Sequence, residues 1–110
     1  MKKLAALTFA IATATTAFVA PAQAEHRGWY VIMGSFDYRA TSAAQRRSNE
    51  VQDECGLDAR WDDAIYFSGL NPNVVFVYMG PYHAKSRARA VLREAKQCVS
   101  DAYMKFGRPN

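Results

Sequence analysis

The sequence predicts an α+β fold, in which one antiparallel sheet carries two helices. An internal repeat is the first observation behind this prediction: the segment Val31–Phe36 returns 46 residues later as Val77–Tyr82, with a similar apolar run, a glycine and a following aromatic residue. The second observation is that a stretch with helical spacing follows each copy. Two strand-turn-helix units are therefore expected, at about residues 29–61 and 74–107.

The first 24 residues, 1–24, have the features of a signal peptide. Two lysines precede an apolar stretch that reaches about Ala20, and a small-x-small sequence ends at Ala24. We expect cleavage between Ala24 and Glu25, which leaves one small domain of residues 25–110. The apolar stretch is shorter than the roughly 20 strongly apolar residues of a membrane span. The mature chain is therefore expected to be periplasmic or secreted, and not embedded in a membrane.

The first unit begins with a strand at Trp29–Phe36, an apolar run rich in aromatic and branched residues that ends at a glycine turn. A helix should follow, because Ser42 and Gln45 have the spacing of a capping box. Gly56 is expected to end this helix, since a residue without Cβ readily takes the left-handed conformation after the last turn. A strand is also expected at Cys55–Trp61, by its position in the repeat, although its sequence pattern is less regular.

Residues 62–73 are expected to form a loop that contains several apolar residues and therefore packs against another part of the protein. The second unit then has a strand at 74–82 and a helix from Ala84 to about Val99, with small and apolar residues on one stripe. The last strand, at 101–107, alternates in polarity and places Tyr103 and Lys105 on one side. The resulting order, β-α-β-β-α-β, predicts a ferredoxin-like fold: a four-stranded antiparallel sheet with both helices on one face.

The sheet face opposite the helices is the predicted functional surface. Side chains alternate along a strand, so two sets of residues are separated. Those expected to face the helices are Val31, Met33, Val75, Val77 and Met79. Those expected on the other face are Tyr30, Ile32, Val74, Phe76 and Tyr78. This second set would form a half-aromatic platform that stacks on flat ligands. Alternatively, the loop at 62–73 folds over this face and makes a second, minor core.

The two strands and their helices resemble a known family. Trp29–Phe36 and Val75–Tyr82, each followed by a helix, are similar to the sporulation-related repeat (SPOR) domain over nearly all of the mature chain. The resemblance implies the same fold, a place in the bacterial cell envelope, and binding to peptidoglycan glycan strands stripped of their stem peptides. It implies a glycan site on the open sheet face, formed by Tyr30, Ile32, Ser35, Val74, Phe76 and Tyr78. Ile32 and Phe76 depart from the pattern, since family members often carry glutamine and arginine there.

Cys55 and Cys98 are the only possible intramolecular disulfide pair, and the oxidising compartment of an exported protein favours the bond. The expected fold makes the geometry difficult. In a ferredoxin-like arrangement the helices run antiparallel, so their C-terminal ends lie further apart than the roughly 4.4 to 6.8 Å that a disulfide allows between Cα atoms. Either one cysteine lies past its helix in a connecting loop, or the bond forms between two chains.

Charge is unevenly distributed along the mature chain. Residues 25–67 contain five basic and eight acidic residues, and residues 68–110 contain seven basic and two acidic ones. Much of the positive charge follows one side of the second predicted helix, at Lys85, Arg89, Arg93 and Lys96. Such a stripe could meet an anionic polymer, a lipid head group or an acidic partner, or it could be an ordinary solvated helix face.

The sequence contains no recognisable catalytic or metal-binding motif. His26 and His83 lack a metal-ligand spacing, and Gly34 and Gly80 are single turn glycines rather than a phosphate loop. We therefore expect no enzyme activity, no metal and no cofactor. The leading function is a non-catalytic envelope module that binds peptidoglycan glycan. The alternative is a periplasmic protein-interaction or dimerisation domain that contacts other envelope proteins. Nucleic-acid binding fits the topology but not the predicted export.

Overall fold

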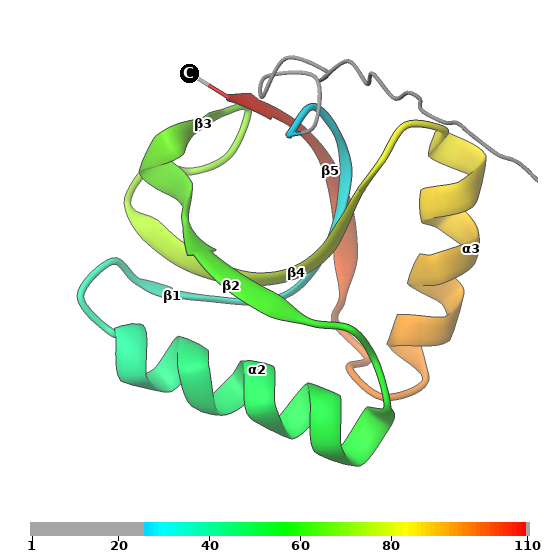
Figure 1. The fold of residues 1–110 in the computed structure, drawn as a ribbon, viewed down its shortest axis with the longest axis horizontal. Coiled ribbons are helices and arrows are strands. Elements are labelled where there is room, and N and C mark those ends of the chain that lie inside the picture. The colour runs from blue at the N-terminus through cyan, green and yellow to red at the C-terminus, as the bar shows by residue number, and fades with distance from the viewer. Residues whose placement is uncertain (1–25, 110) are drawn as a thin grey trace, which may run out of the picture.

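The computed structural model describes residues 26–109, so the predicted signal peptide and its cleavage site lie outside the described residues. The described part is an α+β fold, as predicted (Figure 1). Its elements, in chain order, are β1 (Gly28–Asp37), α2 (Thr41–Cys55), β2 (Arg60–Asp63), the 3-10 helix η2 (Ala64–Tyr66), β3 (Phe67–Ser68), β4 (Val74–Tyr82), α3 (Lys85–Lys96) and β5 (Tyr103–Pro109).

The sheet is antiparallel and contains five strands, in the order β2-β4-β1-β5-β3. The prediction of four strands is wrong, because β3 forms inside the expected loop and pairs with the C-terminal end of β5. The sheet is also strongly curled, so that in Figure 1 the strands form most of a ring. The two edge strands, β2 and β3, follow each other in the chain through η2 and complete this ring.

The two repeated glycines lie inside the central strands rather than in turns, which corrects the sequence prediction. The register between β1 and β4 shifts between Ile32 and Gly34. Gly80 has a φ of 113°, and a Cβ atom there would lie 2.9 Å from the carbonyl oxygen of Trp29. A register irregularity increases the local bend and twist of a strand. These positions therefore favour the curl of the sheet.

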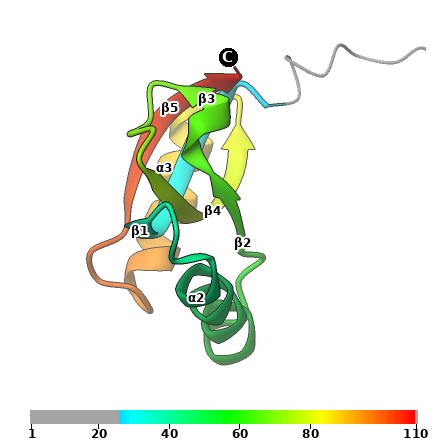
Figure 2. The ribbon, with the colours of Figure 1, turned by 90° about the vertical axis from the view of Figure 1, so that its left-hand side faces the viewer.

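Both helices pack on the same face of the sheet, as predicted. Figure 2 shows α2 nearly end-on below the strands and α3 behind them. The core between the two layers includes Val31, Met33, Val75, Val77 and Met79 from the strands and Ala44, Val51, Ala88 and Ala95 from the helices. All five strand residues expected to face the helices are in this core. The alanines are fully buried and let the helix backbones approach the sheet closely.

The start of α2 differs from the prediction, and its end agrees with it. Ser42 lies within the first turn rather than at the N-cap, which is Ala40 and has no side-chain hydrogen bond. The expected capping box is therefore absent. Gly56 takes the left-handed conformation after the last turn, with a φ of 67°, and its N–H donates to the carbonyl oxygen of Gln52. The strand that follows begins at Arg60, later than expected.

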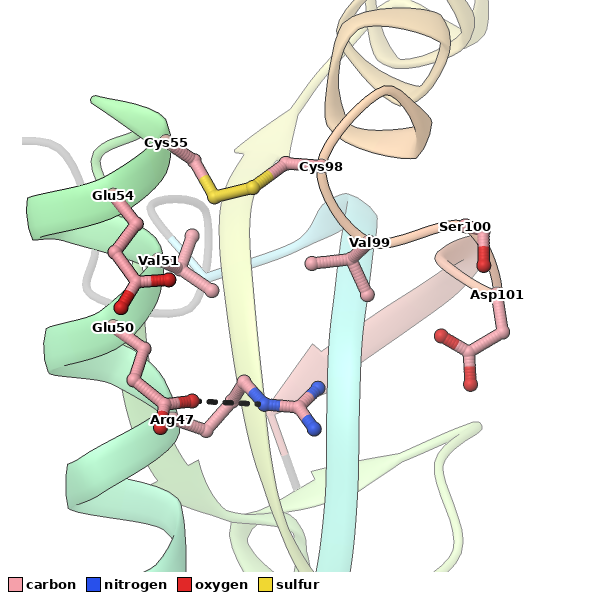
Figure 3. A pocket seen from close by; sticks show the side chains of 9 residues that line it. All are labelled: Arg47, Glu50, Val51, Glu54, Cys55, Cys98, Val99, Ser100 and Asp101. Carbon is pink, nitrogen blue, oxygen red and sulfur yellow. Dashed lines mark ion pairs between the residues drawn. A yellow bond between two sulfur atoms is a disulfide. The ribbon is translucent and has the colours of Figure 1, made fainter.

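The disulfide between Cys55 and Cys98 is present, with the two Cα atoms 6.0 Å apart. Cys55 is the last residue of α2, whereas Cys98 lies past the end of α3, in the connection to β5. The first of the two expected alternatives is thus confirmed. The curled sheet also turns the helices relative to each other, so that their C-terminal ends converge (Figures 1 and 3). The expected antiparallel arrangement of the helices was the wrong assumption.

Loss of the disulfide should lower the free energy of unfolding by about 2 to 5 kcal/mol, since the bond closes a long loop in the unfolded chain. The measurement is urea denaturation of the wild type and of the double variant Cys55→Ala/Cys98→Ala. Adding a reductant should destabilise the wild type to the level of the variant and leave the variant unchanged. Equal unfolding free energies for the two proteins would contradict this role.

Candidate functional site

The sheet face opposite the helices is covered by residues 62–73, here called the covering segment. Ala64, Phe67 and Leu70 of this segment pack against the strands and form a second core. The exposed fraction is 1% for Tyr30, 2% for Ile32, 1% for Phe76 and 8% for Tyr78. The expected open platform is therefore wrong, and the alternative of a second, minor core is confirmed. The apolar residues of the loop explain the difference, because they remove the platform from water.

Four aromatic rings form the centre of this second core. The ring of Tyr30 lies edge-on to those of Phe67, Phe76 and Tyr78, at centroid distances of 5.5, 6.1 and 5.3 Å. Phe76 and Tyr78 are stacked at 4.8 Å. Edge-to-face and offset-stacked pairs of this kind add about 0.5 to 1.5 kcal/mol each beyond the burial of their area. These rings hold the covering segment on the sheet.

The hydroxyl group of Tyr30 has a hydrogen-bond partner within the fold. The hydroxyl of Tyr30 donates to the backbone carbonyl oxygen of His26 at 2.5 Å. Burial raises the pKa of Tyr30, and the nearby Tyr78 and Asp62 raise it further. Burial likewise raises the pKa of Tyr78. Both tyrosines are therefore neutral at ordinary pH, and the hydroxyl of Tyr30 is oriented by its hydrogen bond to the backbone of His26.

Part of the covered face remains open as a small pocket, here called the sheet pocket, with a volume of about 110 Å³. Its residues divide into an apolar floor and a polar rim. The floor contains Ile32, Ala64, Leu70, Val74 and Phe76. The rim contains Ser35, Asn71, Tyr103 and Lys105. The structure thus brings four of the six predicted site residues together at this pocket, and it places Tyr30 and Tyr78 elsewhere, in the aromatic core.

Three rim residues were not predicted as site residues. Tyr103 is 46% exposed and lies opposite Ile32 in the pairing of β5 with β1. Lys105 follows on the same side of β5, as the alternation along that strand predicts. Asn71 comes from the turn before β4 and lies at the pocket only because the covering segment folds back over the sheet. The alternation of side chains along β5 could have identified Tyr103 and Lys105 as site residues. No local sequence pattern indicates the position of Asn71.

The side chain of Asn71 is oriented by the backbone. Its Oδ1 atom accepts a hydrogen bond from the N–H of Asn73 at 2.9 Å. The carbonyl oxygen of Asn73 in turn accepts from the N–H of Tyr38 at 3.2 Å, which joins this turn to the end of β1. With Oδ1 engaged, the amide nitrogen of Asn71 is the group that can donate to a ligand. The rim therefore offers an amide donor, a hydroxyl, an ammonium group and an aromatic face.

A larger hollow of about 330 Å³ lies beside the disulfide, between α2 and the connection after α3 (Figure 3). It is lined by several carboxylates and by Arg47. The guanidinium group of Arg47 donates to the carbonyl oxygen of Met33 at 2.8 Å and lies 3.7 Å from the carboxylate of Glu50. This cation therefore links α2 to β1. Because its guanidinium group is already engaged within the fold, the hollow is a weaker candidate for ligand binding than the sheet pocket.

Within residues 26–109, no group of three or more His, Cys, Asp or Glu side chains could hold a metal ion. No helix in this part of the chain is long and apolar enough to cross a membrane. Comparisons with protein-family models, with curated proteins and with solved structures found no match to this chain. The resemblance to the SPOR domain therefore stays a prediction that rests on the strand motifs.

The substitution Phe76→Ala should lower the free energy of unfolding by about 3 to 5 kcal/mol, because it empties the middle of the aromatic core. The matched substitution Tyr103→Ala removes a half-exposed ring from the rim and should change stability by no more than about 0.5 kcal/mol. Urea denaturation of the two variants measures the difference. A small loss for Phe76→Ala would show that the covering segment does not close this face in solution.

Stability should decline as the pH rises above 10.0, the ordinary tyrosine pKa, because burial raises the pKa of Tyr30 and Tyr78 in the folded state. As the pH rises, the tyrosines of the unfolded chain lose their protons before those of the folded protein. The contribution of the neutral tyrosines to the free energy of unfolding is therefore complete below pH 10.0, and it is lost as the pH rises to the folded-state pKa. Urea denaturation over the alkaline range measures this decline. In Tyr30→Phe the decline should be shallower, and an equal slope in both proteins would contradict the assignment.

Proposed function

We propose that this chain is a non-catalytic module of the bacterial cell envelope that binds peptidoglycan glycan strands at the sheet pocket and its rim. The observation that carries the proposal is the pocket itself, in which an apolar floor is surrounded by a half-exposed tyrosine and hydrogen-bonding groups. The predicted signal peptide supports an envelope location. The resemblance to the SPOR domain supports glycan as the ligand.

The strand arrangement is consistent with this family. The two strands that open the repeated units, β1 and β4, lie side by side near the centre of the sheet, and β2 and β5 flank them. Two interlocked β-α-β units with both helices on one face give this arrangement. We infer that the chain is a ferredoxin-like domain of SPOR type to which β3 has been added at one edge. The covering segment that carries β3 moves the ligand site from an open platform to the rim.

The chemistry of the rim suits an amino sugar. A pyranose ring has apolar C–H faces that can stack on Tyr103, and its edges carry hydroxyl groups within reach of Ser35 and Asn71. The pocket is smaller than the roughly 300 to 1,000 Å³ of typical small-molecule sites, so it takes a substituent rather than a whole sugar. An acetamido group fits this description, with its methyl group on the apolar floor and its carbonyl oxygen towards the amide nitrogen of Asn71.

Lys105 gives a reason for preferring glycan without stem peptides. Hydrolysis of the amide bond that attaches the peptide leaves a carboxylate on the sugar. An ammonium group on the rim can pair with that carboxylate in a charge-assisted hydrogen bond. The intact strand instead presents a bulky peptide at this position. Binding should therefore increase when the peptides are removed.

Co-sedimentation with cell-wall sacculi, before and after amidase treatment, tests the proposal. The wild type should bind the treated sacculi more tightly, and Tyr103→Ala should weaken that binding about tenfold, as expected for one lost aromatic contact with its hydrogen bond. Tyr66→Ala is the matched control, because Tyr66 is 65% exposed but lies at a different hollow, with His26 and Pro109. The control should bind as the wild type does.

Failure of the folded wild type to bind either preparation would contradict the proposal. Protein interaction within the envelope would then be the remaining class of function. Equal losses in Tyr103→Ala and Tyr66→Ala would place the binding surface away from the sheet pocket. Circular dichroism of each variant shows whether a loss of binding follows from a loss of folding.

A further inference from the structure

The cationic stripe on α3 has no part in the proposed glycan site. Its side chains, at Lys85, Arg89, Arg93 and Lys96, are exposed in the structure. They extend over eleven residue steps of about 1.5 Å, or roughly 16 Å along the helix. The helix packs on the sheet face opposite the sheet pocket and forms the outer edge of the molecule in Figure 1. The stripe and the pocket therefore lie on different surfaces.

Nearby acidic groups do not neutralise this stripe. The ion pairs found within residues 26–109 are Asp37–Arg39, Arg47–Glu50 and Asp58–Arg60. None of them involves α3, in which Glu94 is the only acidic residue. A solvated helix face usually carries charges of both signs, which pair at a spacing of three or four residues. The stripe instead presents an extended surface of one sign.

Half-buried aromatic rings adjoin the positive charges. The ammonium group of Lys85 lies 4.9 Å from the ring centroid of Trp29, and the guanidinium carbon of Arg108 lies 5.6 Å from that of Phe106. The rings of Trp29 and Phe106 are themselves in edge-on contact at 5.4 Å. Cations beside Trp and Phe rings are typical of surfaces that meet the headgroup region of a bilayer.

We propose that α3, with the adjoining rings of Trp29 and Phe106, is a docking surface for an anionic phospholipid membrane. Its shape favours a flat partner over a small anion, because the four cations lie in a row along roughly 16 Å of helix rather than around one point. The hollow beside them holds a carboxylate as well as cations, since Glu94 lines it together with Arg87 and Arg93, and it is therefore no anion pocket. Its charge complements anionic headgroups, which attract each nearby Lys or Arg. The domain can thus lie on a membrane while the sheet pocket faces away from it. This proposal does not depend on the glycan site.

Vesicle co-sedimentation tests the docking surface. The protein is purified after expression of the full chain, and its mass identifies its N-terminal residue. It should bind vesicles that contain phosphatidylglycerol, bind pure phosphatidylcholine vesicles far more weakly, and lose binding as salt is added. The variant Arg89→Gln/Arg93→Gln should bind about 30-fold more weakly, since two of the four stripe charges are lost. Glutamine keeps the helix propensity of these exposed positions.

The control variant is Arg46→Gln/Arg60→Gln, which removes the same net charge from α2 and β2. Its affinity for the vesicles should stay within about twofold of the wild type, because exposed charges distant from the surface are screened. Equal losses in the two variants would overturn the proposal, since binding would then follow net charge alone. Absence of binding to phosphatidylglycerol vesicles would also overturn it. Binding to soluble dextran sulfate but not to vesicles would assign the stripe to an anionic polymer instead.

Discussion

The pairing of β1 with β4 is the interaction on which both cores depend. Each of these central strands sends alternate side chains to opposite faces of the sheet. Val31 and Val77 pack against the helices, while Tyr30 and Phe76 pack against the covering segment. A one-residue slip in this pairing would exchange the two sets and disrupt both cores together. The helices, the covering segment and the sheet pocket are all positioned by this single ladder.

The local elements could be predicted because their signals are local. The repeat, the helical stripe of α3 and the left-handed Gly56 each lie within a short window of sequence. The strand β3 could not be predicted in this way, because Phe67 and Ser68 form a strand only by pairing with Pro109 and Arg108 at the far end of the chain. The curl of the sheet is also a non-local property, since it depends on register shifts between strands.

The burial of the aromatic platform did leave a signal in the sequence. The run Val74–Met79 is apolar without interruption, and strands with one wet face usually alternate apolar and polar residues. A continuous run therefore favours burial on both sides. Of the candidate site, Ile32, Ser35, Val74 and Phe76 could be predicted from strand periodicity and the family resemblance. The contribution of Asn71 depends on how the covering segment crosses the sheet, which no short window of sequence encodes.

The first and last described residues, His26 and Pro109, line one common hollow. Ser35 and Tyr103, at the rim of the sheet pocket, lie further along β1 and β5, away from these ends. Domains whose first and last elements lie close together in this way tolerate circular permutation and insertion into a loop of another protein. This domain could therefore be spliced into a host chain as a unit, with both junctions on one side and its rim facing outward.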